Sequence, residues 1–308
     1  MTSNPFIPIL CIALLAVSCH RESESKKKIE TTSDTIFVEE ATIVDTIVAF
    51  EKKELKYQFL FIDSVFIAHI REYFNEYELN VLLHINRIDY SKLYKTDTLI
   101  VPDTFYTDIN TYSPFPDSLS ILHDINKIIL ISYACQAMGL YECGKLLKWF
   151  PVSMGKKSTP TPTGLYHTNW KSKKTISTDN DAWILPWYFN LINKTGVSLH
   201  QYELPGVPAS SSCVRMMEEH AQFIYYWAEQ WKLTPDERNI LAHGTPVIIY
   251  GEYNFDHSPP WYNLPQNSKV LDENTDSLNS MLQNHIDLIR KRQYQLDSII
   301  VERSKAFL

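Results

Sequence analysis

A series of short, strand-like apolar segments between residues 127 and 250 is the feature that most constrains the fold of this 308-residue chain. Such segments lie at 127–133, 136–141, 145–152, 164–170, 182–191, 197–200 and 245–250. A turn at 142–144 separates the second segment from the third, which predicts a β-hairpin. One amphipathic helix, predicted at 217–231, interrupts the series. Mostly strands with one helix predict a mainly β domain over 125–253, folded as a β-sandwich or a β-barrel.

The first 53 residues are typical of an export and anchoring segment rather than of a folded domain. The apolar run 4–17 is too short to cross a bilayer as a permanent helix, and residues 1–18 are predicted to be a signal peptide. Small and apolar residues directly precede Cys19, which resembles the lipobox of bacterial lipoproteins, whose cysteine is lipidated; an ordinary cleavable signal with an incidental cysteine is the alternative. The polar stretch 19–53 predicts a flexible tether. Acyl chains on Cys19 would hold the protein to a membrane surface.

Two smaller regions flank the β domain. Residues 54–105 predict a small α+β unit with a helix at 63–77, and their second half resembles the closing half of a LysM module, a small glycan-binding fold. A connector of helix and strand without a ligand is the alternative. A linker that contains Pro and Ser follows at 106–124. The extension 254–308 contains a long amphipathic helix, predicted at 276–308, which would pack on the β domain or pair with another chain.

Charge and motif spacing exclude two kinds of partner. A formal net charge of −7 gives no basic face that would bind nucleic acid. No Cys-x-x-Cys or His-x-x-x-His pair in the sequence could seed a zinc site, so no metal is expected.

Export has a consequence for the five cysteines. Cys11 would leave with the signal and Cys19 would be modified, so Cys135, Cys143 and Cys213 remain. Three is an odd number in an oxidising compartment, so at least one thiol would stay unbridged or pair outside the chain. The sequence is compatible both with a Cys135–Cys143 disulfide and with two buried thiols.

Cys213 is the candidate nucleophile. A cysteine attacks as its thiolate, so it needs a nearby base or positive charge. His200 ends a predicted strand, and a loop containing Gly and Pro returns the chain to Cys213 just before the predicted helix, whose dipole would lower the thiol pKa. The small residues Ser210, Ser211 and Ser212 would let backbone amides approach an oxyanion. Taken alone, such a cysteine and such a histidine are more often core residues.

In combination, these motifs resemble those of the L,D-transpeptidases with a YkuD-type catalytic domain. That family places a His, a loop and then Ser/Thr-His-Gly-Cys, followed by an apolar residue and Arg or Asn. His200 and the stretch 210–215 (SSSCVR) follow this order. The segment 151–164 (PVSMGKKSTPTPTG) is similar to the family's PVSTG and TPTG stretch, and the aromatic strand at 186–189 also fits. The resemblance covers residues 125–252.

The resemblance implies an acyl transfer that needs no metal or organic cofactor. Cys213 would attack a stem-peptide carbonyl of peptidoglycan, between an L-centre of diaminopimelate and D-alanine. His200 would deprotonate the thiol and then protonate the leaving amine. An acceptor amine would give a cross-link or attachment to another protein, and water would give carboxypeptidase activity. A lipidated protein of this kind would be located in the bacterial envelope, at its periplasmic face.

The residues around Cys213 would have the remaining roles. Backbone amides at Ser212 and Cys213 would stabilise the oxyanion, and Arg215, Ser210 and Ser211 would contact the substrate. The chain departs from the family at two positions, since Ser211 replaces its second His and Ser212 replaces its Gly. Because Ser211 cannot act as a base at neutral pH, all proton transfer would depend on the remaining histidine.

The sequence leaves three functions open. They are an active L,D-transpeptidase, a thiol hydrolase of the same architecture that trims stem peptides, and a non-catalytic peptidoglycan-binding lipoprotein. His243 is an alternative base, because papain-like enzymes also place their histidine after the cysteine. It directly precedes a Gly-Thr-Pro turn, however, which predicts a loop position.

Overall fold

The computed structural model describes residues 55–177 and 180–305. The predicted signal peptide, the predicted lipidation site Cys19 and the tether lie outside the described residues. Within the described part of the chain, no helix is both long enough and apolar enough to cross a membrane.

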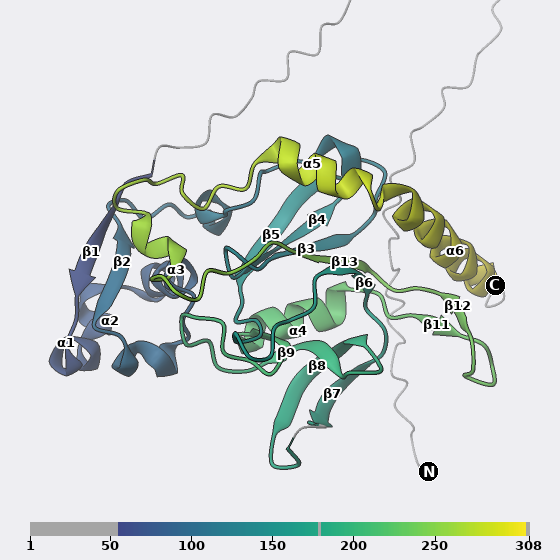
Figure 1. Ribbon diagram of the computed structural model, residues 1–308, viewed down its shortest axis with the longest axis horizontal. Coiled ribbons are helices and arrows are strands. Elements are labelled where there is room, and N and C mark those ends of the chain that lie inside the picture. Colours follow the sequence, from purple (N-terminus) through teal and green to yellow (C-terminus); the bar gives the residue numbers. More distant parts are fainter. Residues whose placement is uncertain (1–54, 178–179, 306–308) are drawn as a thin grey trace, which may run out of the picture. The chain divides into compact units, whose positions relative to one another are not determined.

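A five-stranded mixed sheet forms one layer of the β domain (Figure 1). In spatial order its strands are β5 (Lys145–Pro151), β4 (Ala137–Glu142), β3 (Ile128–Ser132), β13 (Pro246–Tyr250) and β6 (Gly164–His167). Strands β3, β4 and β5 are antiparallel neighbours, whereas β13 pairs with β3 in parallel. Cys143 and Gly144 both have positive φ at the β4–β5 turn, 46° and 76°, as a two-residue type I′ turn requires. The predicted hairpin is therefore confirmed.

A second sheet contains the strand that follows Cys213. In spatial order its strands are β10 (Val214–Met216), β9 (Val197–Gln201), β8 (Ile184–Ile192) and β7 (Lys171–Ile176). Helix α4 (Glu218–Trp227) follows β10 and lies between this sheet and the five-stranded sheet in Figure 1. One core joins the three elements, and its buried apolar side chains include Ile129, Ile131, Met138, Phe189, Leu199, Val214 and Ile224.

The prediction of a mainly β domain is confirmed, and its two sheets do not close into a barrel. Strands β7 and β10 were not predicted, nor was the short hairpin of β11 (Lys232–Leu233) and β12 (Ile240–Ala242). Helix α4 is shorter than the predicted helix 217–231, because Ala228 already has extended backbone angles.

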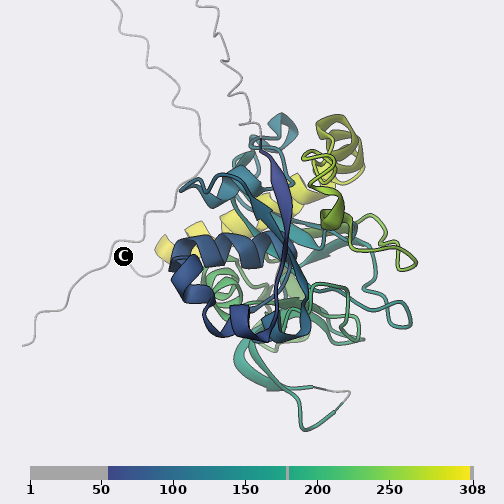
Figure 2. The ribbon, with the colours of Figure 1, turned by 90° about the vertical axis from the view of Figure 1, so that its left-hand side faces the viewer.

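The small N-terminal unit pairs two antiparallel strands, β1 (Tyr57–Phe61) and β2 (Thr98–Pro102). Between them lie α1 (Ser64–Ala68), α2 (Ile70–Tyr73), α3 (Glu76–Asn86) and the 3-10 helix η1 (Tyr90–Lys95). In Figure 2, these helices and β1 face the viewer. The predicted single helix 63–77 is wrong, because Asn75 starts a new helix. Its side chain accepts from the Glu78 amide, and the Glu78 carboxylate accepts from the Asn75 amide, which is a capping box.

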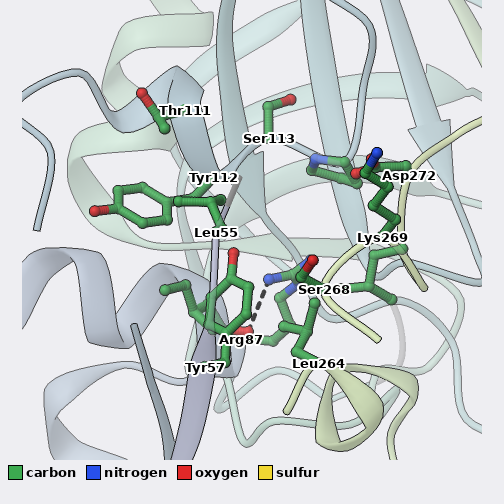
Figure 3. A pocket seen from close by; sticks show the side chains of 13 residues that line it. Leu55, Tyr57, Arg87, Thr111, Tyr112, Ser113, Leu264, Ser268, Lys269 and Asp272 are labelled. Carbon is green, nitrogen blue, oxygen red and sulfur yellow. Dashed lines mark hydrogen bonds between the residues drawn. The ribbon is translucent and has the colours of Figure 1, made fainter. Parts of the chain in front are cut away.

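Arg87 joins this unit to the β domain and to the C-terminal extension. Its guanidinium donates to two carbonyls at the end of α3 and, at 3.0 Å, to the carbonyl of Cys135. The rings of Trp149 and Trp261 lie 5.1 and 5.3 Å from it. Figure 3 shows Arg87 at the wall of a cavity that Tyr57 also lines. Burial lowers the pKa of Arg87 to about 10, so the guanidinium stays charged and its carbonyl and aromatic partners replace water.

Cys135 is a buried thiol, so it does not form the disulfide with Cys143 that the sequence left open. Its sulfur donates to the carbonyl of Leu271 and lies 3.4 Å from the carboxylate of Glu273. Burial raises the pKa of the Cys135 thiol to about 12, which makes it a poor nucleophile.

The C-terminal extension packs on the β domain, one of the two arrangements expected for it. Its helices are η4 (Pro260–Asn263), α5 (Thr275–Gln283) and α6 (Ile286–Lys305). The prediction of one continuous helix is wrong, because a turn at residues 284–285 separates α5 from α6. Arg290 of α6 binds the Asp124 carboxylate through two hydrogen bonds of 2.7 and 3.1 Å. The predicted linker contains two 3-10 helices, η2 (Ile109–Tyr112) and η3 (Ser120–Leu122), with side chains in the core.

Two buried histidines meet where α3 contacts the β domain. The rings of His84 and His220 lie 4.9 Å apart, and His220 stacks on Phe150 at 4.1 Å. Burial lowers the pKa of His84 to about 4 and that of His220 well below its ordinary value. Among the described residues, the Nδ1 atom of His220 has no hydrogen-bond partner. Both rings are therefore neutral at pH 7, and the fold resists their protonation.

Acid should destabilise the protein through this pair. Above about pH 6.5 the histidines are neutral in the folded and unfolded states, so they impose no penalty. As the pH falls from 6.5 towards 4, the two histidines bind protons in the unfolded chain but not in the folded protein. The free energy of unfolding therefore decreases. His220→Phe should keep the stacking on Phe150 and reduce this decrease between pH 8 and pH 5 by on the order of 1 kcal/mol. Urea unfolding at pH 8 and pH 5 measures the decrease in the free energy of unfolding. The same decrease in His220→Phe and in the parent would contradict the role of His220 in acid destabilisation.

Candidate active site

The candidate nucleophile lies at the start of an edge strand. Cys213 directly precedes β10, whose Arg215 pairs in parallel with His200 of β9. This register places Cys213 beside Ser198, and its sulfur lies 3.4 Å from the Ser198 hydroxyl oxygen. Side chains two residues apart on a strand share a face, so His200 and Ser198 lie on the same face. The structure thus brings the predicted nucleophile and the predicted base to neighbouring positions on two paired strands.

The expectation that a helix directly follows Cys213 is wrong. Strand β10 comes first, and α4 begins only at Glu218. The effect of a helix dipole falls off within the first turn, so α4 gives little support to a thiolate at Cys213. Other groups must stabilise that charge.

The Cys213 side chain is half-buried and is a thiol. Its sulfur donates a weak hydrogen bond of 3.7 Å to the carbonyl of Gly196, an arrangement that suits the protonated thiol rather than the thiolate. The main-chain carbonyl of Cys213 accepts from the Ser210 hydroxyl at 2.5 Å, which fixes the end of the preceding loop.

His200 is buried, and its Nδ1 atom lies 2.9 Å from the carbonyl oxygen of Gln201. When Nδ1 carries the proton and donates it to this carbonyl, Nε2 keeps its lone pair and can accept a proton. Burial is the main cause that lowers the pKa of His200 to about 4, and the charge of Arg215 lowers it further, against the effect of the Gln201 hydrogen bond. The imidazole is therefore neutral at pH 7, the form that a general base requires.

Arg215 places a positive charge beside both residues. Its guanidinium lies 4.5 Å from the centre of the Tyr202 ring, and its main chain exchanges hydrogen bonds of 3.0 and 3.1 Å with Ser153. Burial lowers the pKa of Arg215, while its interaction with Cys213 favours the charged guanidinium. By the same interaction, Arg215 favours the Cys213 thiolate.

The segment 151–164 supports the loop that carries the nucleophile. The Ser210 amide donates to the carbonyl of Met154, and the Ser210 carbonyl accepts from the Lys156 amide, both at 3.0 Å. The Gly155 amide donates to the Thr161 hydroxyl at 2.8 Å. A side chain at Gly155 would meet the carbonyl oxygen of residue 159 at 2.2 Å, so only glycine fits. The motif similarity of this segment therefore has a structural basis, although it supplies no reacting group.

Ser212 has a left-handed backbone conformation, with φ of 82°. Its hydroxyl donates to the carbonyl of Thr159 at 3.3 Å. Glycine takes this conformation without steric cost, whereas a residue with a side chain pays on the order of 1 kcal/mol. Ser211, in the same loop, is half-buried and does not have positive φ.

Hydrogen bonds from the N-terminal unit hold the loop between His200 and Cys213. The sequence did not predict these contacts. The Asp89 amide donates to the Leu204 carbonyl at 3.1 Å, and the Asp89 carboxylate accepts from the Leu204 amide at 2.6 Å. The Gly206 amide donates to the carbonyl of residue 87, also at 3.1 Å. These contacts join segments more than a hundred residues apart, and no local pattern indicates them. The Ser198 contact could have been found, since Ser198 lies two residues before His200 on a predicted strand.

His243, the alternative base, belongs to a different cluster. Its ring lies 4.9 Å from that of His167. Burial lowers the pKa of His243, and the charge of Arg292 in α6 lowers it further. His167 in turn contacts the Arg292 guanidinium at 3.2 Å. Within residues 55–177 and 180–305, no group of three His, Cys, Asp or Glu side chains is arranged to bind a metal ion.

Solved structures of L,D-transpeptidases are similar to part of the chain. The enzyme from Stackebrandtia nassauensis is 20% identical, with a TM-score of 0.33, over 42% of this chain and 57% of its own. That from Mycobacterium smegmatis is 17% identical, with a TM-score of 0.32, over 41% and 59%. L,D-transpeptidase 1 of Mycobacterium tuberculosis is 20% identical, with a TM-score of 0.31, over 41% and 62%. The chain thus spans less than two thirds of each of these structures.

No curated protein matches the chain by sequence. The family model of the YkuD L,D-transpeptidase catalytic domain does match it, over residues 126–249. This stretch begins two residues before β3, ends within β13, and contains Cys213, His200 and the loop between them. Over these residues the chain is therefore similar to the YkuD L,D-transpeptidase catalytic domain, and the match covers less than half of the chain.

Proposed function

We propose that the protein is an L,D-transpeptidase that acts on peptidoglycan stem peptides through a thioester on Cys213. The observation that carries the proposal is the pairing of β9 with β10, because a neutral buried imidazole and a guanidinium lie on these adjacent strands and the thiol directly precedes β10. A general base and a positive charge beside a cysteine are the requirements of nucleophilic thiol catalysis.

In the first half-reaction, His200 Nε2 takes the proton of Cys213, and the sulfur attacks the stem-peptide carbonyl carbon. Backbone amides at Ser212 and Cys213 stabilise the oxyanion. The tetrahedral intermediate collapses as its C–N bond breaks, and His200 returns the proton to the leaving amine of D-alanine. The product is an acyl-enzyme thioester and a neutral imidazole.

In the second half-reaction, an acceptor amine attacks the thioester carbonyl while His200 takes its proton and returns it to the sulfur. A second stem peptide gives a cross-link, and an amine on another protein gives attachment. The side chain of Arg215 supplies a positive charge that would bind a substrate carboxylate. Ser210 and Ser211 lie on the same loop, where they would contact the donor peptide.

The proposed location is the bacterial envelope. Its support is the sequence around Cys19, which would carry the lipid anchor at the periplasmic face of a membrane. The strand–helix–strand unit before the β domain would bind glycan of the same peptidoglycan, as its LysM-like sequence suggests. Helix α6 packs on the β domain with one face and could contact a partner with exposed side chains such as Tyr294.

A second candidate function is a peptidoglycan-binding protein without turnover. The low pKa of His200 favours it, because a weak base transfers a thiol proton less readily. A thiol hydrolase of the same architecture differs only in the acceptor, which would be water. The products separate all three functions.

Peptidoglycan fragments test the proposal directly. Incubation with purified tetrapeptide fragments should give cross-linked dimers with release of D-alanine, visible by mass spectrometry. Cys213→Ala should abolish the products, while Cys135→Ala should retain them because Cys135 is a buried, protonated thiol. Tripeptides without dimers would identify the hydrolase, and no conversion by folded protein would leave the binding function.

The pH dependence of kcat/KM should show the unusual pKa of His200. Turnover needs the neutral imidazole, so activity should fall on the acid side near pH 4 rather than near pH 6.5. Arg215→Met removes a charge that lowers this pKa, so its acid limb should move to higher pH. Circular dichroism at each pH verifies the fold. An acid limb near 6.5 in the parent would contradict the lowered pKa of His200, and a limb that Arg215→Met leaves in place would contradict its role as the base.

The backbone strain at Ser212 predicts opposite effects of two neighbouring substitutions. Ser212→Gly relieves the left-handed conformation, whereas Ser211→Gly only adds flexibility to the unfolded chain. Ser212→Gly should therefore be more stable than Ser211→Gly by about 1–2 kcal/mol. Urea denaturation of the two variants measures the difference. Equal stability would mean that Ser212 is not strained.

A further inference from the structure

A buried polar network leads from the sulfur of Cys213 to strand β8. The Ser198 hydroxyl lies 3.4 Å from the sulfur. Burial raises the pKa of the neighbouring Tyr188 phenol, and the side chains of Asn190 and Ser198 lower it. The Asn190 amide donates to the Tyr188 oxygen at 3.1 Å, and the Tyr188 hydroxyl donates to the carbonyl of Gly196 at 3.2 Å. The side chains of Ser198, Tyr188 and Asn190 are buried, with 0%, 3% and 1% of their surface exposed.

The network is anchored away from the thiol. The side-chain amide of Asn169 donates to the Asn190 oxygen and to the carbonyl of Leu191, both at 2.9 Å. Tyr188 therefore keeps a donor from Asn190 and an acceptor at the Gly196 carbonyl, whichever way the Ser198 hydroxyl points. A hydroxyl that can turn without leaving its neighbours unpaired is suited to respond to a change of charge.

We propose that the Ser198 hydroxyl stabilises the thiolate of Cys213 by turning to donate a hydrogen bond to its sulfur. The inference rests on the proposed function, because it adds a group to the same nucleophile. In the resting protein the thiol proton points to the Gly196 carbonyl and Ser198 is able to donate to Tyr188. When Cys213 passes its proton to His200 Nε2, the Gly196 contact is lost and the Ser198 hydrogen moves from the Tyr188 oxygen to the sulfur.

The surroundings of Cys213 explain why such a donor is needed. Among the described residues, the titratable groups near it include Arg215 on β10 and Tyr188 on β8, which interact with it electrostatically, and His200 on β9, which pairs with Arg215. His200 is a weak base in its buried position, so an imidazolium beside the sulfur forms at a cost. Helix α4 begins too late to help. Ser198 is already in contact with the sulfur, and a hydrogen bond to an ionised group is stronger than one to a neutral group.

The pH dependence of alkylation by iodoacetamide tests this role on the full chain, without peptidoglycan. The rate follows the thiolate, so its midpoint reports the pKa of the Cys213 thiol. Ser198→Ala should raise the midpoint by about one pH unit. Ser198→Thr retains the hydroxyl and should restore the parent's midpoint. Ser298→Ala, on α6, should leave it unchanged.

Tyr188→Phe is the matched control, since it removes one buried hydroxyl from the same network but leaves the one at the sulfur. Its midpoint should not rise, because Ser198 then has no competing acceptor at Tyr188. An equal rise in Tyr188→Phe and Ser198→Ala would assign the effect to the polarity of the network and overturn the role of Ser198. A midpoint of Ser198→Ala equal to that of the parent would overturn it as well.

The result is separable from the proposed function. A shifted midpoint in Ser198→Ala with no turnover by the parent would refute the transpeptidase and retain Ser198 as the donor. Turnover by the parent with no shift would do the opposite. A folded parent whose Cys213 resists alkylation at every pH would refute both.

Discussion

The parallel pairing of β9 with β10 is the interaction on which the candidate site depends. Three residue pairs define it, and one of them places Arg215 opposite His200. So short a strand at the edge of a sheet has little stability of its own. On the side of β10 that faces away from β9, Ser153 exchanges two main-chain hydrogen bonds with Arg215 and so supports the strand. The position of Cys213 follows from support on both sides of a three-residue strand.

The N-terminal unit contributes to the same support from outside the β domain. Asp89 and the carbonyl of residue 87 hold the loop between His200 and Cys213. Arg87 itself is buried against Trp149 of the β domain and Trp261 of the C-terminal extension. Because a buried charge that loses its partners is costly, this junction resists opening. The unit therefore holds the loop between His200 and Cys213 in place. This role is separate from any binding of a ligand by the unit.

Much of the β domain could be predicted from its sequence, because buried strands such as β3 are continuous apolar runs and the β4–β5 turn has Gly144 where positive φ is needed. Strand β10 could not, since three residues show no periodicity. The helix 63–77 was mispredicted because apolar spacing continued across two helix ends. Helix α1 ends at Ala68, α2 ends at Tyr73, and the capping box at Asn75 begins α3. The contacts of Asp89 with the catalytic loop are formed by tertiary packing alone.

The motif order indicated Cys213 and His200 as candidates, but their electrostatics could not be predicted. Burial of His200 and its position beside Arg215 make it a neutral, weak base, and this depends on the fold rather than on spacing. In the proposed mechanism, Cys213 forms the acyl-enzyme and His200 acts as its base. The most direct measurement is the intact mass of the protein after incubation with a carbapenem, followed by peptide mapping. A single adduct on Cys213, formed more slowly in His200→Ala and absent in Cys213→Ala, is expected. A folded protein without an adduct, or with the adduct on Cys135, would contradict this mechanism.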